Sequence, residues 1–263
     1  MSGYTRYVAL GDSQTEGLWD GDDAGGLTGF ADRLAIMLDS LRPGLEYANL
    51  AIRGRRIADV KDDQLPRALA MRPDLVTLCI GMNDVIRPGN AFDRALGDLE
   101  DVYLALARSG ATVVTTTFPD IAQILPVGRV LAGRVRRINS VIRESSTRHG
   151  FRLVDLFGAP SMREPDTWSI DRVHGSTKGH RLFAAAAAEA LGLPGSSHDW
   201  AHNGAGGAWP SWRTRLTSQA LWTRNMLMPY LWWHLRGRAV GDDRDARRPE
   251  LRRVQPAPAR GPA

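Results

Sequence analysis

Short apolar runs alternate with longer amphipathic segments from the start of the chain to residue 193. The apolar runs predict strands at Tyr7–Leu10, Glu46–Leu50, Leu75–Ile80, Thr112–Thr117 and Arg152–Leu156. The segments between them predict helices at Gly29–Leu38, Gln64–Met71, Phe92–Ser109, Arg129–His149 and Lys178–Leu191. Strands that alternate with helices favour an α/β fold, in which a parallel sheet is covered on both faces. Because ligands of such sheets bind at the carboxyl ends of the strands, the residues after each strand are the first candidates for chemistry.

The composition of the chain changes abruptly after Pro194. We therefore divide the sequence into a catalytic body at 1–194, an extension at 195–236 and a tail at 237–263. The extension is amphipathic, rich in tryptophan and arginine, and contains a glycine-rich hinge near its start. The tail is rich in arginine, aspartate and proline, a composition that predicts disorder.

The net charge of +5 is carried by the C-terminal part of the chain. Residues 195–263 hold 11 basic and 5 acidic side chains, a net +6, whereas residues 1–194 hold 23 and 24, a net −1. The single cysteine, Cys79, forbids an internal disulfide and a metal site of several cysteines. The N-terminus is too polar for a secretory signal, and no apolar run is long enough to span a bilayer. We therefore expect a cytoplasmic protein.

Two polar clusters could supply a nucleophile and its base. Gly11-Asp12-Ser13 directly follows the first predicted strand, and a serine at such a turn is exposed beside backbone amides. The alternative is that Ser13 only caps the next helix. Asp171 precedes His174 by three residues, so its carboxylate can bond Nδ1–H and leave Nε2 free to take a proton. A surface Asp–His pair is the alternative there, and we expect His180 to be structural.

Two further clusters could supply hydrogen-bond donors to the same crevice. Asn49–Gly54 ends the second predicted strand, and a glycine there can aim its N–H at a ligand. Gly54 is equally compatible with a turn that needs a positive φ. In Gly81–Asp84, the side-chain amide of Asn83 could donate into the crevice, or could form an Asx turn. We expect Asp84 to accept hydrogen bonds from backbone amides and to take no part in chemistry.

Together the clusters supply every group that acyl transfer requires. A serine nucleophile needs a base, the base needs a group that orients it, and the oxyanion needs fixed donors. Ser13, His174 and Asp171 can fill the first three roles. The backbone N–H groups of Ser13 and Gly54 and the side-chain amide of Asn83 can fill the last.

The clusters also follow the order and approximate separations of the sequence blocks of the SGNH (GDSL-type) hydrolases, which the chain resembles over roughly residues 5–193. The residues that carry the resemblance are Gly11-Asp12-Ser13, Asn49…Gly54, Gly81-x-Asn83-Asp84 and Asp171-x-x-His174. The resemblance implies a flavodoxin-like three-layer α/β/α fold, here with a five-stranded parallel sheet, a serine esterase or lipase activity, and no metal or cofactor. It assigns the catalytic triad to Ser13, Asp171 and His174, and the oxyanion hole to Ser13, Gly54 and Asn83.

Two positions depart from the pattern of that family. Gln14 stands where a leucine usually follows the serine, and Gly175 stands where a proline often follows the histidine. Neither position contributes a catalytic group, so the departures concern the subfamily more than the activity. Arg53, just before the oxyanion glycine, is bulky and charged. It could contact a polar or anionic substrate, or simply point to solvent.

We therefore expect a serine-dependent hydrolase that forms an acyl-enzyme from a carboxylic ester, with a short acyl chain, a sugar or a lipid. An O-acyltransferase with the same triad and a non-catalytic flavodoxin-like binding protein are the alternatives. The tryptophans and arginines of the extension suit the surface of an anionic bilayer, so peripheral membrane contact is a further expectation. Packing over the body or a dimer contact is the alternative. No nucleic-acid partner is expected, and the oligomeric state stays open.

Overall fold

The computed structural model describes residues 3–22, 24, 26–124, 128–202 and 243–254. Within them, six strands form the main sheet, in the order β7-β6-β5-β1-β4-β8. Five are parallel: β1 (Arg6–Gly11), β4 (Glu46–Asn49), β5 (Leu75–Cys79), β6 (Thr112–Thr116) and β7 (Arg152–Val154). The chain places β4 on one side of β1 and then β5 on the other, which is the doubly wound, flavodoxin-like arrangement. The predicted α/β fold is confirmed.

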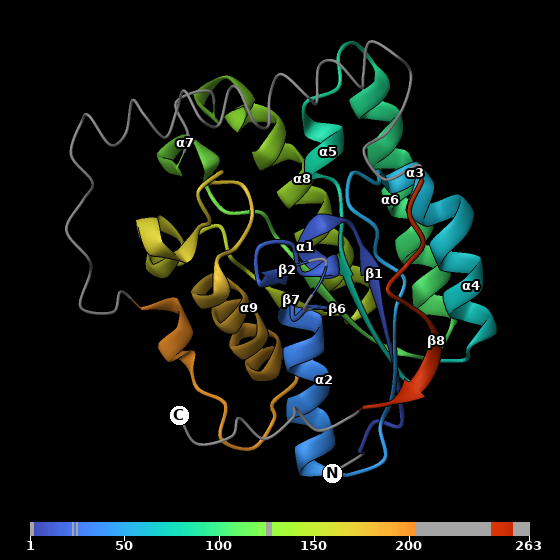
Figure 1. Cartoon of the computed structure of the whole chain (residues 1–263). Helices are drawn as coiled ribbons and strands as arrows, with labels where there is room; N and C mark the ends of the chain where they lie inside the picture. The colour runs from blue at the N-terminus through green and yellow to red at the C-terminus, as the bar shows by residue number, and fades with distance from the viewer. Residues whose placement is uncertain (1–2, 23, 25, 125–127, 203–242, 255–263) are drawn as a thin grey trace.

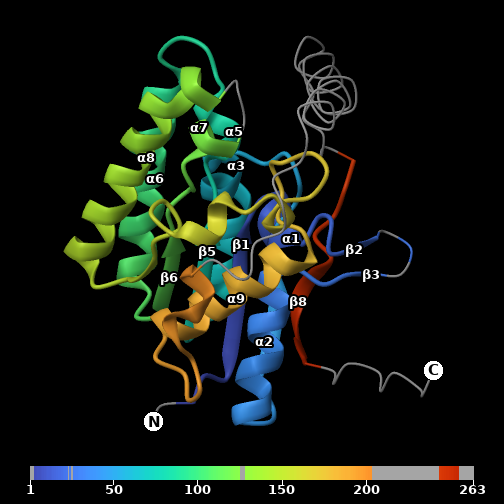
Figure 2. The same cartoon turned by 90° about the vertical axis from the view of Figure 1, so that its left-hand side faces the viewer.

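Helices cover both faces of the sheet, so that the body has three layers (Figures 1 and 2). On one face α2 packs against α9, and on the other α6 packs against α8. The helices are α1 (Ser13–Glu16), α2 (Phe30–Leu41), α3 (Ile57–Asp59), α4 (Leu65–Ala70), α5 (Met82–Val85), α6 (Ala91–Arg108), α7 (Ile121–Ile124), α8 (Gly128–His149) and α9 (Thr177–Ala190). Each of the five predicted helices matches one of the longer ones to within a few residues.

Shorter elements connect these layers. A π-helical turn, η1 (Val60–Gln64), joins α3 to α4, and a small hairpin is formed by β2 (Gly21–Asp22) and β3 (Gly26–Leu27). Three 3₁₀ turns are η2 (Pro160–Arg163), η3 (Pro165–Thr167) and η4 (His198–Ala201). The first two lie in the segment between β7 and α9.

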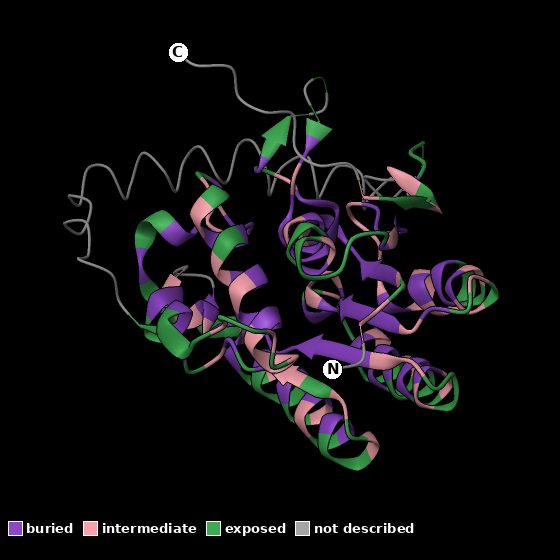
Figure 3. Ribbon diagram, turned by 90° about the horizontal axis from the view of Figure 1, so that it is seen from below, coloured by how far each residue is buried: buried purple, intermediate pink, exposed green. Residues whose placement is uncertain are grey.

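The pattern of buried side chains explains why these elements form. All five residues of β5 are buried, as expected for a strand covered on both faces. Along α6 the buried residues recur every three or four positions, from Phe92 to Leu106, which turns one apolar stripe toward the sheet. Figure 3 shows the result: the central strands are purple, between helices whose outer surfaces are green or pink. The core therefore lies in two layers, one on each side of the sheet.

The sixth strand corrects two predictions. β8 (Arg248–Arg253) pairs antiparallel with β4 at the edge of the sheet, so the sheet has six strands and not five. This stretch also falls within 237–263, where the composition suggests disorder. Its sequence shows little apolar alternation because an edge strand is stabilised mainly by backbone pairing and exposes charged side chains to water. Its proline lies where the register with β4 shifts, a position that strands tolerate.

The start of the C-terminal extension packs on the body. In η4, the side chain of Trp200 is 7% exposed, and its indole N–H donates to Glu189 on α9. The rest of the predicted amphipathic extension, at 203–236, lies outside the described residues, and so does its expected membrane contact. In the part of the chain that is described, no helix is long and apolar enough to cross a membrane.

Candidate active site

Ser13 lies at the turn between β1 and α1, where it is the first residue of the helix and only 8% exposed. Asp12, and not Ser13, caps this helix, because its Oδ1 accepts the backbone N–H of Gln14 at 3.2 Å. Gly11 has a φ of 150°, and a Cβ at that position would lie 2.3 Å from the carbonyl oxygen of Cys79. Only glycine can therefore make this turn, which leaves the hydroxyl of Ser13 at the carboxyl end of the central strand.

Gln64 fixes the same turn from the side. Its Oε1 accepts the N–H of Gly11, and its Nε2 donates to the carbonyl of Gly11, both at 2.9 Å. The side chain is fully enclosed, with 1% of the residue exposed, and it comes from the π-helical turn η1. Such turns are rare and frequently occur at functional sites. Gln64 therefore holds both backbone polar groups of Gly11, the residue two positions before Ser13.

His174 and Asp171 complete a buried chain of three side chains. Nε2 of His174 lies 2.7 Å from Oγ of Ser13, and Nδ1 lies 2.7 Å from Oδ2 of Asp171. His174 is 7% exposed and Asp171 is 2% exposed. The structure thus brings together three residues that are up to 161 positions apart, as the sequence pattern predicts.

The protonation of this chain follows from its hydrogen bonds. Burial alone would raise the pKa of Asp171, but the hydrogen bonds and charge of His174 lower it to about 2. The other oxygen of Asp171 accepts the Ser169 hydroxyl at 2.6 Å and the N–H of Val173 at 2.8 Å. An ionised Asp171 holds the proton of His174 on Nδ1, so Nε2 presents a lone pair to the hydroxyl of Ser13. That is the tautomer that a general base needs.

The predicted oxyanion donors lie beside the nucleophile. Gly54 has a φ of 80°, which requires glycine, in the loop that follows β4. On α5, Nδ2 of Asn83 donates to the carbonyl of Arg55 at 2.9 Å and, over a longer 3.3 Å, to Oδ2 of Asp12. The amide of Asn83 therefore links the residue after Gly54 to the residue before Ser13. The structure thus brings together Gly54, Asn83 and Ser13.

Two expected structural roles are confirmed. Oδ2 of Asp84 accepts the backbone N–H of Ile57 at 3.0 Å, so this carboxylate ties α5 to α3. His180 is fully buried on α9, where Nδ1 accepts the N–H of Phe30 at 3.2 Å and Nε2 lies 3.0 Å from the carbonyl of Leu18. Neither side chain is part of the chain of contacts that runs from Ser13 to Asp171.

Arg53 departs from one of the two interpretations of the sequence, in which it points to solvent. Its guanidinium pairs with the buried Glu16 on α1, with Nη2 2.8 Å from Oε1 and Nε 3.0 Å from Oε2. The backbone N–H of Arg53 also donates to Glu16, at 2.7 Å. The side chain is only 13% exposed, so it does not point to solvent. Its pairing locks the loop that carries Gly54 to the helix that carries Ser13.

Sequence reasoning missed Gln64, which supports the turn before Ser13, and Glu16, which supports the loop that carries Gly54. Both act on backbone groups that are distant in the chain, and no local spacing announces such contacts. A polar residue at a buried position of an amphipathic segment would have been the only indication. In the described residues, no group of three or more His, Cys, Asp or Glu side chains could hold a metal ion.

The doubly wound α/β body carries a buried Ser–His–Asp chain at the carboxyl end of its central strand, an arrangement that recurs in serine hydrolases of unrelated folds. The profile of the GDSL-like lipase/acylhydrolase family matches residues 9–182, most of the body. The chain belongs to this family and is a carboxylic ester hydrolase.

Known relatives agree with this assignment. An acetylxylan esterase of Geobacillus stearothermophilus is 26% identical over 186 residues, which cover 63% of this chain and 82% of the relative. The crystal structure of that organism's acetylxylan esterase Axe2 is similar with a TM-score of 0.61 at 20% identity, covering 74% of this chain and 97% of Axe2. LAE5, an alpha/beta hydrolase from the metagenome of Lake Arreo in Spain, gives a TM-score of 0.59 at 23% identity and covers 72% and 95%. At this identity, the two structures support the fold alone.

Proposed function

We propose that the protein hydrolyses carboxylic esters through an acyl-enzyme formed on Ser13. The observation that carries the proposal is the continuous contact from Oγ of Ser13 through the imidazole of His174 to Asp171, each step 2.7 Å long. Both hydrogen bonds have the length expected for a nucleophile, its base and the group that orients the base. Their burial keeps water from competing for the same atoms.

In the first half of the reaction, Nε2 of His174 takes the proton of Ser13 as Oγ attacks the carbonyl carbon of the ester. The negative charge of Asp171 stabilises the imidazolium that results. When the tetrahedral intermediate collapses, the bond to the alkoxide oxygen breaks, and that oxygen takes the proton from Nε2. Water then repeats the sequence on the acyl-enzyme: His174 takes a proton from the water as its oxygen attacks the acyl carbon. The bond from the acyl carbon to Oγ then breaks, Oγ takes that proton from Nε2, and the carboxylic acid is released.

The oxyanion of each intermediate would be held by the N–H groups of Ser13 and Gly54 and by Nδ2 of Asn83. The hydrogen bond from Asn83 to Arg55 holds the amide in place, while the one to Asp12 is long at 3.3 Å. The oxyanion would therefore recruit the N–H that now points at Asp12. Loss of one such donor typically costs about 10²–10³ in turnover.

The substrate class is proposed from the relatives. The acetylxylan esterase of Geobacillus stearothermophilus supports an acetylated carbohydrate as the first class to test. A short acyl chain on another alcohol, including a lipid, would use the same chemistry. The experiment therefore compares acetate, butyrate and longer esters with an acetylated xylooligosaccharide.

The replacement Ser13→Ala tests the mechanism. We expect hydrolysis of p-nitrophenyl acetate to fall at least about 10³-fold, because no other group can form the acyl-enzyme. Circular dichroism should show an unchanged fold. The matched control is Ser40→Ala, which removes a hydroxyl that bonds Met37 on the exposed end of α2. Full activity of Ser13→Ala would exclude the proposed nucleophile, and acyl transfer to an added alcohol in preference to water would contradict hydrolysis.

A further inference from the structure

The two departures from the family pattern contact each other. The backbone N–H of Gly175 donates to Oε1 of Gln14 at 3.1 Å. Gln14 directly follows Ser13 and Gly175 directly follows His174, so the bond joins the neighbours of the nucleophile and of the base. The residues usual in the family could not form this bond, because a leucine at 14 has no acceptor and a proline at 175 has no N–H to donate.

The backbone around Gly175 explains why this N–H faces α1. Gly175 forms an isolated antiparallel bridge with Trp168. The hydrogen bonds of that bridge come from the flanking residues: Ser169 N–H to the His174 carbonyl at 2.9 Å, and Ser176 N–H to the Thr167 carbonyl at 3.0 Å. The N–H of Gly175 therefore points away from Trp168. It is buried and needs an acceptor, which the side chain of Gln14 supplies.

We propose that Gln14 is a positioning residue, whose hydrogen bond to Gly175 keeps the imidazole of His174 aligned with Ser13 throughout the reaction. This inference rests on the proposed function. Gln14 touches none of the atoms that react in that mechanism. It acts through the backbone of the residue that follows the base.

The need for such a contact follows from the chemistry. In the proposed mechanism the 2.7 Å hydrogen bond between Ser13 and His174 is broken once Oγ binds the acyl carbon and Nε2 passes its proton to the leaving group. During the acyl-enzyme stage that bond cannot hold the segment that carries His174. The bond between Gln14 and Gly175 involves no reacting atom, so it persists while protons move. It keeps Nε2 where the attacking water needs a base.

The replacement Gln14→Leu removes the acceptor and leaves a buried N–H without a partner, which the segment can relieve only by moving. We expect kcat for p-nitrophenyl acetate to fall about tenfold, with KM changed less than about twofold, because a displacement of about 1 Å costs up to about 100-fold in rate. The conservative replacement Gln14→Glu keeps an acceptor oxygen at the same reach. It should retain kcat to within about threefold at its own optimal pH.

The donor is tested with two replacements of Gly175. A Cβ at this position would lie 3.0 Å from Cε2 of Phe183, so Gly175→Ala measures the effect of the added atom while keeping the N–H. Gly175→Pro adds the Cβ together with two further ring carbons, fixes φ and removes the N–H. In the background of Gly175→Pro, replacing Gln14 with leucine should cost no more than about twofold, because its partner is already lost.

Three measurements separate the possible outcomes. The parent must be active and Ser13→Ala inactive, which establishes the proposed function independently of Gln14. Asp39→Leu is the matched control: it removes a side-chain acceptor of the Gly44 and Leu45 N–H groups just before β4, at the amino ends of the strands and away from the site, and should lower stability but not kcat. The positioning role would be overturned by an unchanged kcat in Gln14→Leu. It would also be overturned if the kcat losses of Gln14→Leu and Gly175→Pro multiplied in the double variant. Neither result would contradict the proposed hydrolysis.

Discussion

Two buried carboxyl groups flank the nucleophile, and their pKa values are shifted in opposite directions. The hydrogen bonds and charge of His174 outweigh burial at Asp171 and lower its pKa to about 2. At Asp12, burial raises the pKa to about 7, because its hydrogen bond from Gln14 and the nearby His174 offset the loss of water only in part. Asp171 therefore stays ionised at neutral pH, whereas Asp12 is close to half protonated beside the amide of Asn83.

The raised pKa of Asp12 predicts a pH-dependent stability. The folded protein holds a proton on Asp12 up to about pH 7, whereas the unfolded chain releases it near pH 4. The contribution of this group is therefore most favourable below about pH 4 and is lost as the pH rises to about 7. Asp12→Asn removes the charge, so the variant should gain stability relative to the parent as the pH rises: the free energy of unfolding of the variant minus that of the parent should be larger at pH 8 than at pH 4, by roughly a few kcal/mol.

Urea denaturation followed by tryptophan fluorescence measures this difference. The replacement also disturbs the contacts with Gln14 and Asn83, but that cost is similar at both pH values and cancels in the comparison. An equal difference at pH 4 and pH 8 would show that Asp12 does not titrate in this range.

At the scale of elements, helices α2 and α9 are joined by one polar side chain in an apolar contact. His180 on α9 accepts the first free N–H of α2, at Phe30, through Nδ1. Its Nε2 must then carry the proton and donate to the Leu18 carbonyl. Burial lowers the pKa of His180 to about 4, against the hydrogen bond to Leu18 and the charge of Asp20. The neutral ring is therefore the form that holds the two helices together.

The low pKa of His180 predicts acid sensitivity. The unfolded chain binds a proton at this histidine near pH 6.5 but the folded protein does so only near pH 4, so its stabilising effect is complete above 6.5 and is lost as the pH falls to about 4. His180→Leu should be less stable than the parent at pH 7, and the gap should narrow at pH 4.5 by on the order of 2 kcal/mol. Thermal melts at both pH values check this. The exposed His202→Leu serves as control, and a gap that does not depend on pH would contradict the assignment.

The secondary-structure elements differ in how well the sequence predicts them. The five parallel strands and five of the helices follow from apolar runs and from 3.6-residue periodicity, most clearly in β5 and α6, where burial is repeated along the element. Helices such as α1 and α5, of four residues each, are too short for any period to be visible. β8 was missed because an edge strand gains its stability from backbone pairing, which leaves no apolar pattern in the sequence.

The residues of the candidate site also differ in how far the sequence predicts them. Ser13, Asp171 and His174 could be found because each lies in a short motif whose spacing reflects local geometry. The supports of the site could not, because Glu16 and Gln64 bond to backbone groups 37 and 53 positions away. The pairing of Arg53 was missed for the same reason: only the fold reveals a buried carboxylate beside it. Gln14 and Gly175 were recognised as unusual, but their contact spans 161 positions.

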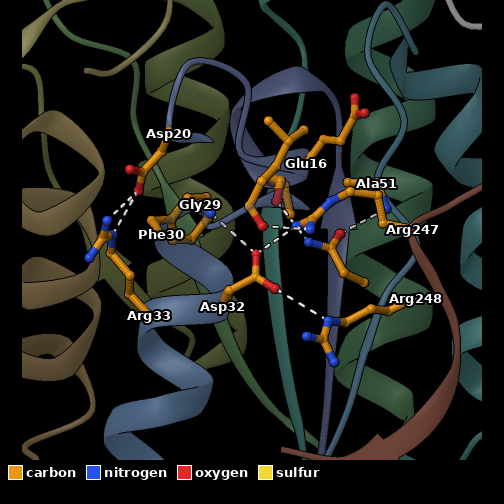
Figure 4. A network of polar contacts seen from close by, with 12 residues as sticks. Glu16, Asp20, Gly29, Phe30, Asp32, Arg33, Ala51, Arg247 and Arg248 are labelled. Carbon is orange, nitrogen blue, oxygen red and sulfur yellow. Dashed lines mark hydrogen bonds and ion pairs between the residues drawn. The ribbon is translucent and has the colours of Figure 1, made fainter. Parts of the chain in front are cut away.

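At the scale of the whole molecule, the C-terminal strand returns to the N-terminal part of the body. Arg247, just before β8, donates from Nη2 to Oδ2 of Asp32 and from Nη1 to the Leu27 carbonyl, both at 2.7 Å (Figure 4). Nε of Arg248 lies 3.5 Å from the other carboxylate oxygen of Asp32, Oδ1. Asp32 also accepts the N–H of Gly29 at 3.2 Å, so it caps α2. Residues near the two ends of the chain thus share one buried carboxylate.

Loss of Arg247 should therefore affect the entire fold. The side chain of Asp32 is 8% exposed, and burial raises its pKa in spite of both arginines, so its desolvation is already costly. Removing the arginine leaves this charge without its main partner, and we expect Arg247→Ala to lower the free energy of unfolding by about 3 kcal/mol. In the double variant with Asp32→Asn, most of that loss should disappear, because no buried charge remains to be compensated.

The control is Arg252→Ala on β8. The side chain of Arg252 is 74% exposed, so its removal should change the free energy of unfolding by less than about 0.5 kcal/mol. Urea denaturation of the parent, Arg247→Ala, the double variant and Arg252→Ala measures the free energy of unfolding of each. Equal losses for Arg247→Ala and Arg252→Ala would mean that β8 is held by backbone pairing alone.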